Sequence, residues 1–117
     1  MLFAGAVLAA MLGGLVVVTA ALSDWAERDF PMLGRHVEVD GLKLHVVEDG
    51  GGPAVVFIHG AFGAAQDFTS TLFAGAKGRY RVIAIDRPGH GYSERPPSGP
   101  LTPDVQARLL RGAWQAM

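Results

Sequence analysis

The chain has 117 residues, which is enough for one domain at most. Its ten basic and eleven acidic residues nearly balance and form no basic patch, so we expect no nucleic-acid partner. Cysteine is absent, which excludes disulfides and thiolate metal sites. A hydrophobic content of 50% argues against a disordered chain.

An uncharged, apolar stretch opens the sequence. It covers residues 2–22, and as a helix it would be about 31 Å long, enough to cross the hydrocarbon core of a bilayer. We therefore predict a transmembrane anchor or signal segment over residues 1–23, with residues 2–22 as the membrane contact. A single-pass anchor is the favoured interpretation, because the apolar run has the full spanning length.

Other interpretations of this stretch stay open. Residues 18–20, Val-Thr-Ala, form an acceptable signal-peptide cleavage site that would lead to export, although no lysine or arginine precedes the apolar run. Two further possibilities are a buried helix and a chain that starts at Met32 without the stretch. Arg28 and Arg35 follow it, so the positive-inside rule places the next domain on the cytoplasmic side.

A polar junction over residues 24–34 leads into a predicted domain that begins at residue 35. Asp40-Gly41 separates two runs of alternating polar and apolar residues, 36–39 and 42–48. Asp-Gly between such runs favours a type I′ turn, because that turn needs positive φ at both central residues. The sequence therefore predicts an antiparallel, partly exposed hairpin.

Strands and helices are predicted to alternate after this hairpin. Residues 54–58 contain no polar side chain, which indicates a central, parallel strand covered on both faces. Residues 63–73 are predicted to form a moderately amphipathic helix. The apolar side of this helix is expected to consist of Phe68, Leu72 and Phe73.

A second buried strand is predicted over residues 80–85, and residues 87–101 are rich in proline and glycine and therefore irregular. Thr102-Pro103-Asp104 then marks a helix start, with a capping hydroxyl, a proline and an acid in the first turn. Strands alternating with helices imply an α/β fold with a parallel sheet. Two central strands do not complete such a sheet, so we expect further sequence after Met117.

Two glycine-rich turns follow the two predicted parallel strands. They are His59-Gly60-Ala61-Phe62-Gly63 and Asp86-Arg87-Pro88-Gly89-His90-Gly91-Tyr92-Ser93. Parallel strands deliver such turns to one sheet edge, where open α/β sheets bind ligands. In order and spacing the motifs resemble the N-terminal portion of the α/β-hydrolase fold family, which carries His-Gly-x and then Asp-x-x-Gly-x-Gly-x-Ser. The resemblance covers roughly residues 35–117.

The resemblance implies a role for the first turn. In that family the residue after His-Gly donates a backbone N–H to the oxyanion, which implies Ala61 as the donor and Phe62 as the alternative. His59 would support the geometry of the loop and would not be the catalytic base. Support for the motif is also expected from the other fixed positions, which are Gly60, Gly63, Asp86, Gly89, Gly91 and Ser93.

The resemblance implies a mainly structural role for the second turn. Asp86 is expected to cap turn N–H groups. Ser93 lies outside any strand-elbow-helix context, so it is not expected to be the nucleophile. Arg87 and Tyr92 are expected to border the pocket, because loops at strand ends often line sites.

The resemblance also implies what lies beyond residue 117, namely the nucleophile, acid and histidine of a Ser-acid-His triad, in that order. The domain over residues 35–117 is thus predicted to be partial, truncated before the nucleophile elbow, and inactive alone. The full-length form would be a membrane-anchored hydrolase acting on small-molecule substrates with ester-like carbonyls. Members that cleave epoxides or carbon–halogen bonds commonly have proline where this chain has Phe62. The alternative is an inactive fragment or binding module with half the fold.

Other kinds of site are disfavoured. His59, Asp86 and His90 would be possible zinc ligands, but the paired motifs already explain them. No Gly-x-Gly-x-x-Gly follows either strand, which disfavours dinucleotide binding. We therefore expect neither a metal nor a cofactor, and we expect His36 and His45, in the hairpin, to be solvated or packed.

Overall fold

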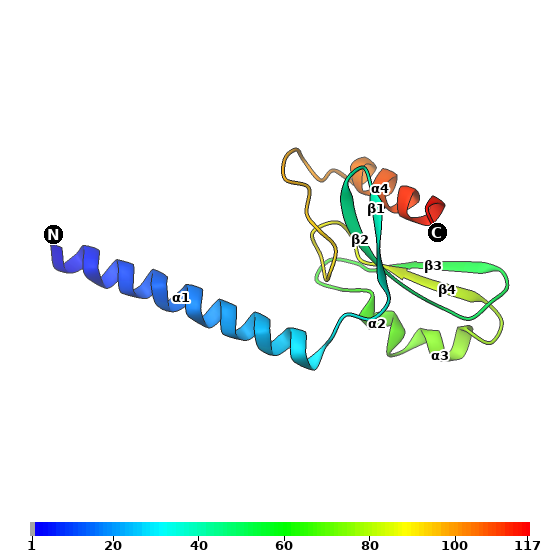
Figure 1. The fold of residues 1–117 in the computed structure, drawn as a ribbon, viewed down its shortest axis with the longest axis horizontal. Helices are drawn as coiled ribbons and strands as arrows, with labels where there is room; N and C mark the ends of the chain where they lie inside the picture. The colour runs from blue at the N-terminus through cyan, green and yellow to red at the C-terminus, as the bar shows by residue number, and fades with distance from the viewer. Residues whose placement is uncertain (1) are drawn as a thin grey trace. The chain divides into compact units, whose positions relative to one another are not determined.

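The computed structural model describes residues 2–117 and divides the chain into two compact units, Met1–Met32 and Leu33–Met117. The first unit contains helix α1, Leu2–Asp29, drawn in blue to cyan in Figure 1. Phe3–Asp29 is long and apolar enough to cross a bilayer, a criterion that an N-terminal signal sequence also meets. The helix continues through the first part of the expected polar junction, where Arg28 Nη2 lies 3.0 Å from Asp24 Oδ2.

The second unit is built on a four-stranded sheet of order β1-β2-β4-β3. The β1–β2 and β2–β4 pairs are antiparallel, and the β3–β4 pair is parallel. This mixed sheet with flanking helices confirms the predicted fold class. The strands are β1 (Arg35–Val39), β2 (Leu42–Asp49), β3 (Ala54–Ile58) and β4 (Arg81–Ile85).

The hairpin between β1 and β2 turns at Asp40-Gly41. The φ angles of these residues are 52° and 76°, as a type I′ turn requires. Val39 faces Leu42 across the turn in antiparallel register. The predicted hairpin is therefore confirmed in its position and its direction.

Strand β3 differs from its prediction. It pairs in parallel with β4, as expected, but it lies at the edge of the sheet, and Ile58 is 52% exposed. Val56 and Ile58 line a groove of about 550 Å³ together with residues of helix α4, Pro103–Gln115. The prediction of a central strand covered on both faces is therefore wrong for these residues. An apolar sequence indicates burial but does not show which strands will be its neighbours.

Two short helices, α2 (Gln66–Thr69) and α3 (Leu72–Ala76), replace the single helix predicted over residues 63–73. The break falls at Ser70 and Thr71. Their hydroxyls donate to backbone carbonyl oxygens in the preceding turn, at 3.1 and 2.6 Å. Such local bonds compete with the helical hydrogen-bond pattern.

The expected apolar side of this helix is also only partly correct. Phe73 is buried and Phe68 is half-buried, but Leu72 is 50% exposed. The break at Ser70 and Thr71 interrupts the helix, so the helical spacing that grouped these three side chains does not hold across it.

Helix α4 starts with Pro103 in its first turn, as predicted. Thr102 makes no side-chain cap hydrogen bond, so the expected capping hydroxyl is wrong. The Thr102 side chain acts on the neighbouring Asp104 carboxylate instead. The Thr102 hydroxyl, with backbone N–H groups of the first turn, lowers the pKa of Asp104.

A hydrophobic cluster lies on each face of the sheet. Helix α4 covers one face and helices α2 and α3 cover the other, so the unit has three layers (Figure 1). This arrangement leaves the turns after β3 and β4 together at one edge. The two clusters consist of Val37, Leu42, Leu44, Val46, Ile83, Ile85, Leu109, Leu110 and Ala113, and of Val47, Ala65, Phe73, Val82 and Ala84.

Candidate functional site

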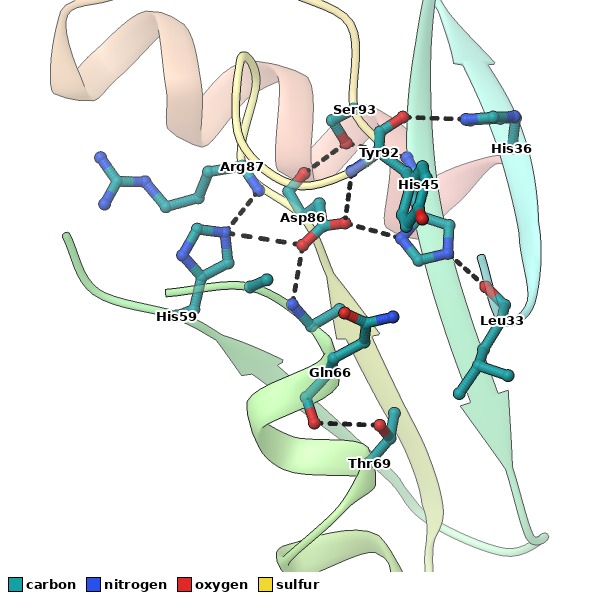
Figure 2. Close-up of polar contacts among 12 residues, drawn as sticks. Leu33, His36, His45, His59, Gln66, Thr69, Asp86, Arg87, Tyr92 and Ser93 are labelled. Atoms are coloured by element: carbon teal, nitrogen blue, oxygen red, sulfur yellow. Dashed lines mark hydrogen bonds and ion pairs between the residues drawn. The ribbon is translucent and has the colours of Figure 1, made fainter. Parts of the chain in front are cut away.

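His59 follows the last residue of β3 and joins the two glycine-rich turns. Its buried ring bonds the Gly60 carbonyl oxygen through Nδ1 at 2.8 Å and accepts the Arg87 N–H at Nε2, at 2.9 Å. Because Nε2 accepts a hydrogen bond, the ring proton lies on Nδ1, which donates to Gly60. With both nitrogens engaged, the ring orients the first turn against the second, as Figure 2 shows for Arg87.

Ala61 and Phe62 form the tip of the first turn. Phe62 has a φ of 63° and a fully exposed side chain. An L-residue in this left-handed region is strained, and such strain persists where the surrounding structure enforces it. Within residues 2–117, neither the Ala61 nor the Phe62 N–H donates a hydrogen bond. Both donors are therefore open to an incoming oxygen atom.

The glycines of the first turn differ in their surroundings. A Cβ on Gly63 would lie 2.9 Å from Asp67 Oδ2 and 3.1 Å from His59 Cβ, so the backbone approaches both side chains closely. Asp67 accepts the Ala64 N–H at 3.0 Å and stabilises the approach to α2. Gly60 has no atom within 4 Å of such a Cβ, so space does not explain its place in the motif.

Asp86, directly after β4, is a buried residue whose carboxylate joins three segments. Oδ1 accepts the Ala65 N–H at 2.7 Å, and Oδ2 accepts the Tyr92 N–H at 3.0 Å. Oδ2 also lies 2.7 Å from His45 Nδ1. Burial raises the pKa of Asp86, but the hydrogen bonds from His45, Ala65 and Tyr92 outweigh it, and the net pKa is lowered. The charged carboxylate thus holds both turns to the sheet (Figure 2).

The second turn closes around Asp86. The buried Ser93 hydroxyl donates a hydrogen bond to the backbone carbonyl oxygen of Asp86 at 2.7 Å. It accepts one from the backbone N–H of His45 at 2.8 Å. Gly91 has a φ of 51°, and a Cβ there would collide with the Asp86 carboxylate. Gly89 also has a positive φ, of 77°. Ser93 is therefore engaged in the scaffold of the turn.

The side chains of Arg87 and Tyr92 contact different parts of the unit. Arg87 Nε donates to Gln106 Oε1 at 2.9 Å, and Arg87 lines the groove between β3 and α4. Tyr92 does not line this groove, and its ring packs edge-on against His45 with the centroids 5.5 Å apart. A place beside a pocket therefore fits Arg87 better than Tyr92.

His45 was expected only to be solvated or packed in the hairpin, and its hydrogen-bond partners were not predicted from the sequence. It is fully buried, and its ring nitrogens bond Asp86 Oδ2 and the Leu33 carbonyl oxygen. Burial lowers the pKa of His45, but the bonds to Asp86 and Leu33 outweigh it, and the net pKa is raised. Residues 44–47 are all buried, so the unbroken run Leu-His-Val-Val was the signal of a strand covered on both faces.

The arrangement supplies hydrogen-bond donors and a rigid scaffold. The open N–H groups at residues 61 and 62 can stabilise negative charge on an oxygen atom. Among the described residues, no group of three or more His, Asp or Glu could hold a metal ion. His59, Asp86 and His90 lie near one another, but their polar atoms serve the two turns.

Comparisons with known proteins agree with this architecture. A protein-family model described as the alpha/beta hydrolase family matches residues 55–115, just over half of the chain. An epoxide hydrolase of Caballeronia sordidicola is 38% identical over 65 residues, which cover 56% of this chain and 20% of that protein. A 2-(acetamidomethylene)succinate hydrolase of Mesorhizobium japonicum is 34% identical over 67 residues, covering 57% and 24%.

Solved structures give the same result. The Cif epoxide hydrolase of Acinetobacter nosocomialis matches 85% of this chain and 33% of its own, with a TM-score of 0.71 and 26% identity. A membrane phospholipase A, described as a bacterial virulence factor, matches 94% of this chain and 37% of its own, with a TM-score of 0.65 and 30% identity. The chain thus spans a fifth to a quarter of these two curated relatives and about a third of these two structures. It belongs to the α/β-hydrolase family.

Proposed function

We propose that this chain is the N-terminal portion of a membrane-anchored α/β-fold hydrolase that acts on small-molecule substrates with ester-like carbonyls. The observation that carries the proposal is the pair of open N–H groups at Ala61 and Phe62, at the end of a strand and held by buried side chains. Attack on an ester carbonyl places negative charge on its oxygen, and such donors stabilise it. Ala61 is the proposed donor, and Phe62 is the alternative.

The reacting groups are proposed to lie beyond residue 117, as a Ser-acid-His triad. His45, His59 and Ser93 are each committed to hydrogen bonds within the scaffold. The exposed edge of β3 and the apolar groove beside it support a larger sheet in the complete protein. The small share of each relative that this chain covers supports the same proposal.

The proposed anchor is helix α1, which supplies a membrane contact through residues 2–22. The similarity to a membrane phospholipase A supports this location and suggests esters that partition into bilayers as substrates. Export after cleavage of a signal peptide is the alternative that the same helix permits.

The test is a steady-state assay of the protein made from its complete reading frame. We expect hydrolysis of p-nitrophenyl esters of increasing acyl length, and covalent labelling by a fluorophosphonate. The epoxide-hydrolase relatives make epoxide opening the second candidate, so styrene oxide is assayed in parallel. Turnover of the epoxide alone would replace the ester proposal. A stop codon directly after the Met117 codon and no turnover would favour the binding module.

A further inference from the structure

The bonding of His45 carries an inference beyond the proposed hydrolase function. Both partners of its ring are acceptors, namely the Asp86 carboxylate at Nδ1 and the Leu33 carbonyl oxygen at Nε2. The Asp86 carboxylate keeps its charge because two backbone N–H groups also donate to it. Neither partner can donate a hydrogen bond to the ring, so both ring nitrogens must carry a proton.

The surroundings of the ring are compatible with a positive charge. The charged side chain that bonds the ring is Asp86, from the end of β4, with Nδ1 and Oδ2 2.7 Å apart. From β1, the His36 ring lies 6.0 Å away and bonds the Tyr92 carbonyl oxygen. From the second turn, the Tyr92 ring lies 5.5 Å away. His59 stands on the far side of Asp86, with Nε2 3.9 Å from Oδ1.

The backbone at Leu33-Gly34 packs closely against the backbone of strand β2. A Cβ on Gly34 would collide with the Val46 carbonyl oxygen, and the φ of Gly34 is 77°. Leu33 is the first residue of the α/β unit and follows the segment that contains α1. The bond from His45 to the Leu33 carbonyl oxygen therefore fixes the point at which the chain joins the sheet.

We propose that His45 is a positioning residue that works as a buried imidazolium. One N–H holds the entry of the chain at Leu33, and the other holds Asp86. Asp86 in turn holds Ala65, four residues after Ala61, through its other oxygen. The segment that leads from the membrane-spanning helix is thus tied to the turn that carries the oxyanion donors. The protonation state rests on the hydrogen bonds of His45 and Asp86 and on the charge of that carboxylate, whereas its consequence for the donors rests on the proposed function.

The first test is ¹⁵N-resolved NMR of the imidazole rings of the full 117-residue chain in detergent micelles. The chain has four histidines, and His36→Gln and His45→Gln assign the two hairpin rings. At pH 7 we expect both nitrogens of His45 to be protonated, while His59 shows one proton-free nitrogen. A proton-free nitrogen on His45 at this pH would overturn the proposal, whatever the activity of the complete enzyme.

The second test separates the two bonds by amide hydrogen exchange. His45→Asn places an N–H₂ group near the position of Nδ1, and His45→Gln places one near Nε2. We expect His45→Asn to keep the protection of the Ala65 N–H but to speed exchange at the start of β1 at least tenfold. His45→Gln should show the reverse pattern. Equal effects of the two variants at both places would show that His45 only fills space, and would contradict the proposal.

Discussion

The carboxylate of Asp86 accepts hydrogen bonds from three parts of the chain, the β2 strand, the approach to α2 and the second turn. Asp86→Asn keeps the shape of the side chain but removes its charge and one acceptor. It leaves the imidazolium of His45 buried without a counter-ion. We expect the free energy of unfolding to fall by about 3–5 kcal/mol, the usual cost of breaking a buried pair.

Urea denaturation followed by circular dichroism measures this change. Asp104→Asn is the matched control, because Asp104 is an exposed carboxylate in the first turn of α4. Its effect should be small by comparison. If the two variants lost the same stability, Asp86 would not be the centre of the scaffold.

The His45–Asp86 pair also makes stability depend on pH. The pKa of Asp86 is lowered in the folded state, so its contribution is present above the unfolded value of about 3.9 and is lost as pH falls. The pKa of His45 is raised, so its contribution is full below the unfolded value of about 6.5. That contribution is lost as pH rises through the folded pKa.

We therefore expect the melting temperature to be highest between about pH 4 and pH 6.5 and to decline on the alkaline side. Glu48 and Asp49 also have lowered pKa values, through their bonds to Arg81 and Lys77, so they contribute to the acid side. The alkaline decline belongs to His45. A His45→Gln variant with the same decline as the wild type would assign it to another group.

The strained backbone at Phe62 gives a third expectation. A left-handed conformation costs an L-residue about 1–2 kcal/mol, and glycine escapes this cost. Because the Phe62 side chain is fully exposed, its removal loses no packing. Phe62→Gly should therefore be more stable than Phe62→Ala in a urea titration, since only alanine retains the strain. The opposite order would mean that the φ of 63° carries no strain.

At the scale of elements, helix α4 is held to the sheet by its buried side. Leu109 is 4% exposed and belongs to the cluster between α4 and the sheet. Leu109→Ala should lower the free energy of unfolding by about 2–5 kcal/mol through lost burial and a residual cavity. Arg111→Ala, on the exposed side of the same helix, should have little effect. If Leu109→Ala and Arg111→Ala lowered the free energy of unfolding equally, the packing of Leu109 against the sheet would not be what holds α4 in place.

The elements with a local cause were predictable from the sequence. Asp40-Gly41 dictates its turn by backbone conformation alone, and Pro103 starts its helix for the same reason. The break between α2 and α3 depends on where the Ser70 and Thr71 hydroxyls bond, which helical periodicity does not contain. The exposure of β3 depends on which strands become its neighbours in space.

In the candidate site, too, the features with a local cause were predictable from the sequence, and those that depend on distant contacts were not. The positions of His59 and Asp86 followed from motifs at strand ends, because parallel strands bring their following turns together. The partners of Asp86 did not follow, since Ala65 and His45 are 21 and 41 residues away in the sequence. His45 lies in a strand whose burial on both faces was visible only as an unbroken run, and the charge that we propose for it follows from its two acceptors.

At the scale of the whole molecule, the proposed membrane location depends on helix α1, the apolar helix near the N-terminus. We expect the protein to stay with membranes after washing with alkaline carbonate and to be released by detergent. Deletion of residues 2–22 should move the α/β unit to the soluble fraction. A wild-type chain that is soluble, or shortened after residues 18–20, would favour export after cleavage.

The central claim is that the Ala61 N–H stabilises the oxyanion. Replacing Ala61 by its α-hydroxy acid, in the protein made from its complete reading frame, removes only this N–H and keeps the side chain. The account predicts a fall in kcat for ester hydrolysis of about 100- to 1000-fold, the usual effect of losing one oxyanion donor. The same exchange at Phe62 is the matched control and should leave kcat near the wild-type value. An unchanged kcat for the Ala61 analogue would contradict the claim, and a loss at Phe62 alone would transfer the role to that residue.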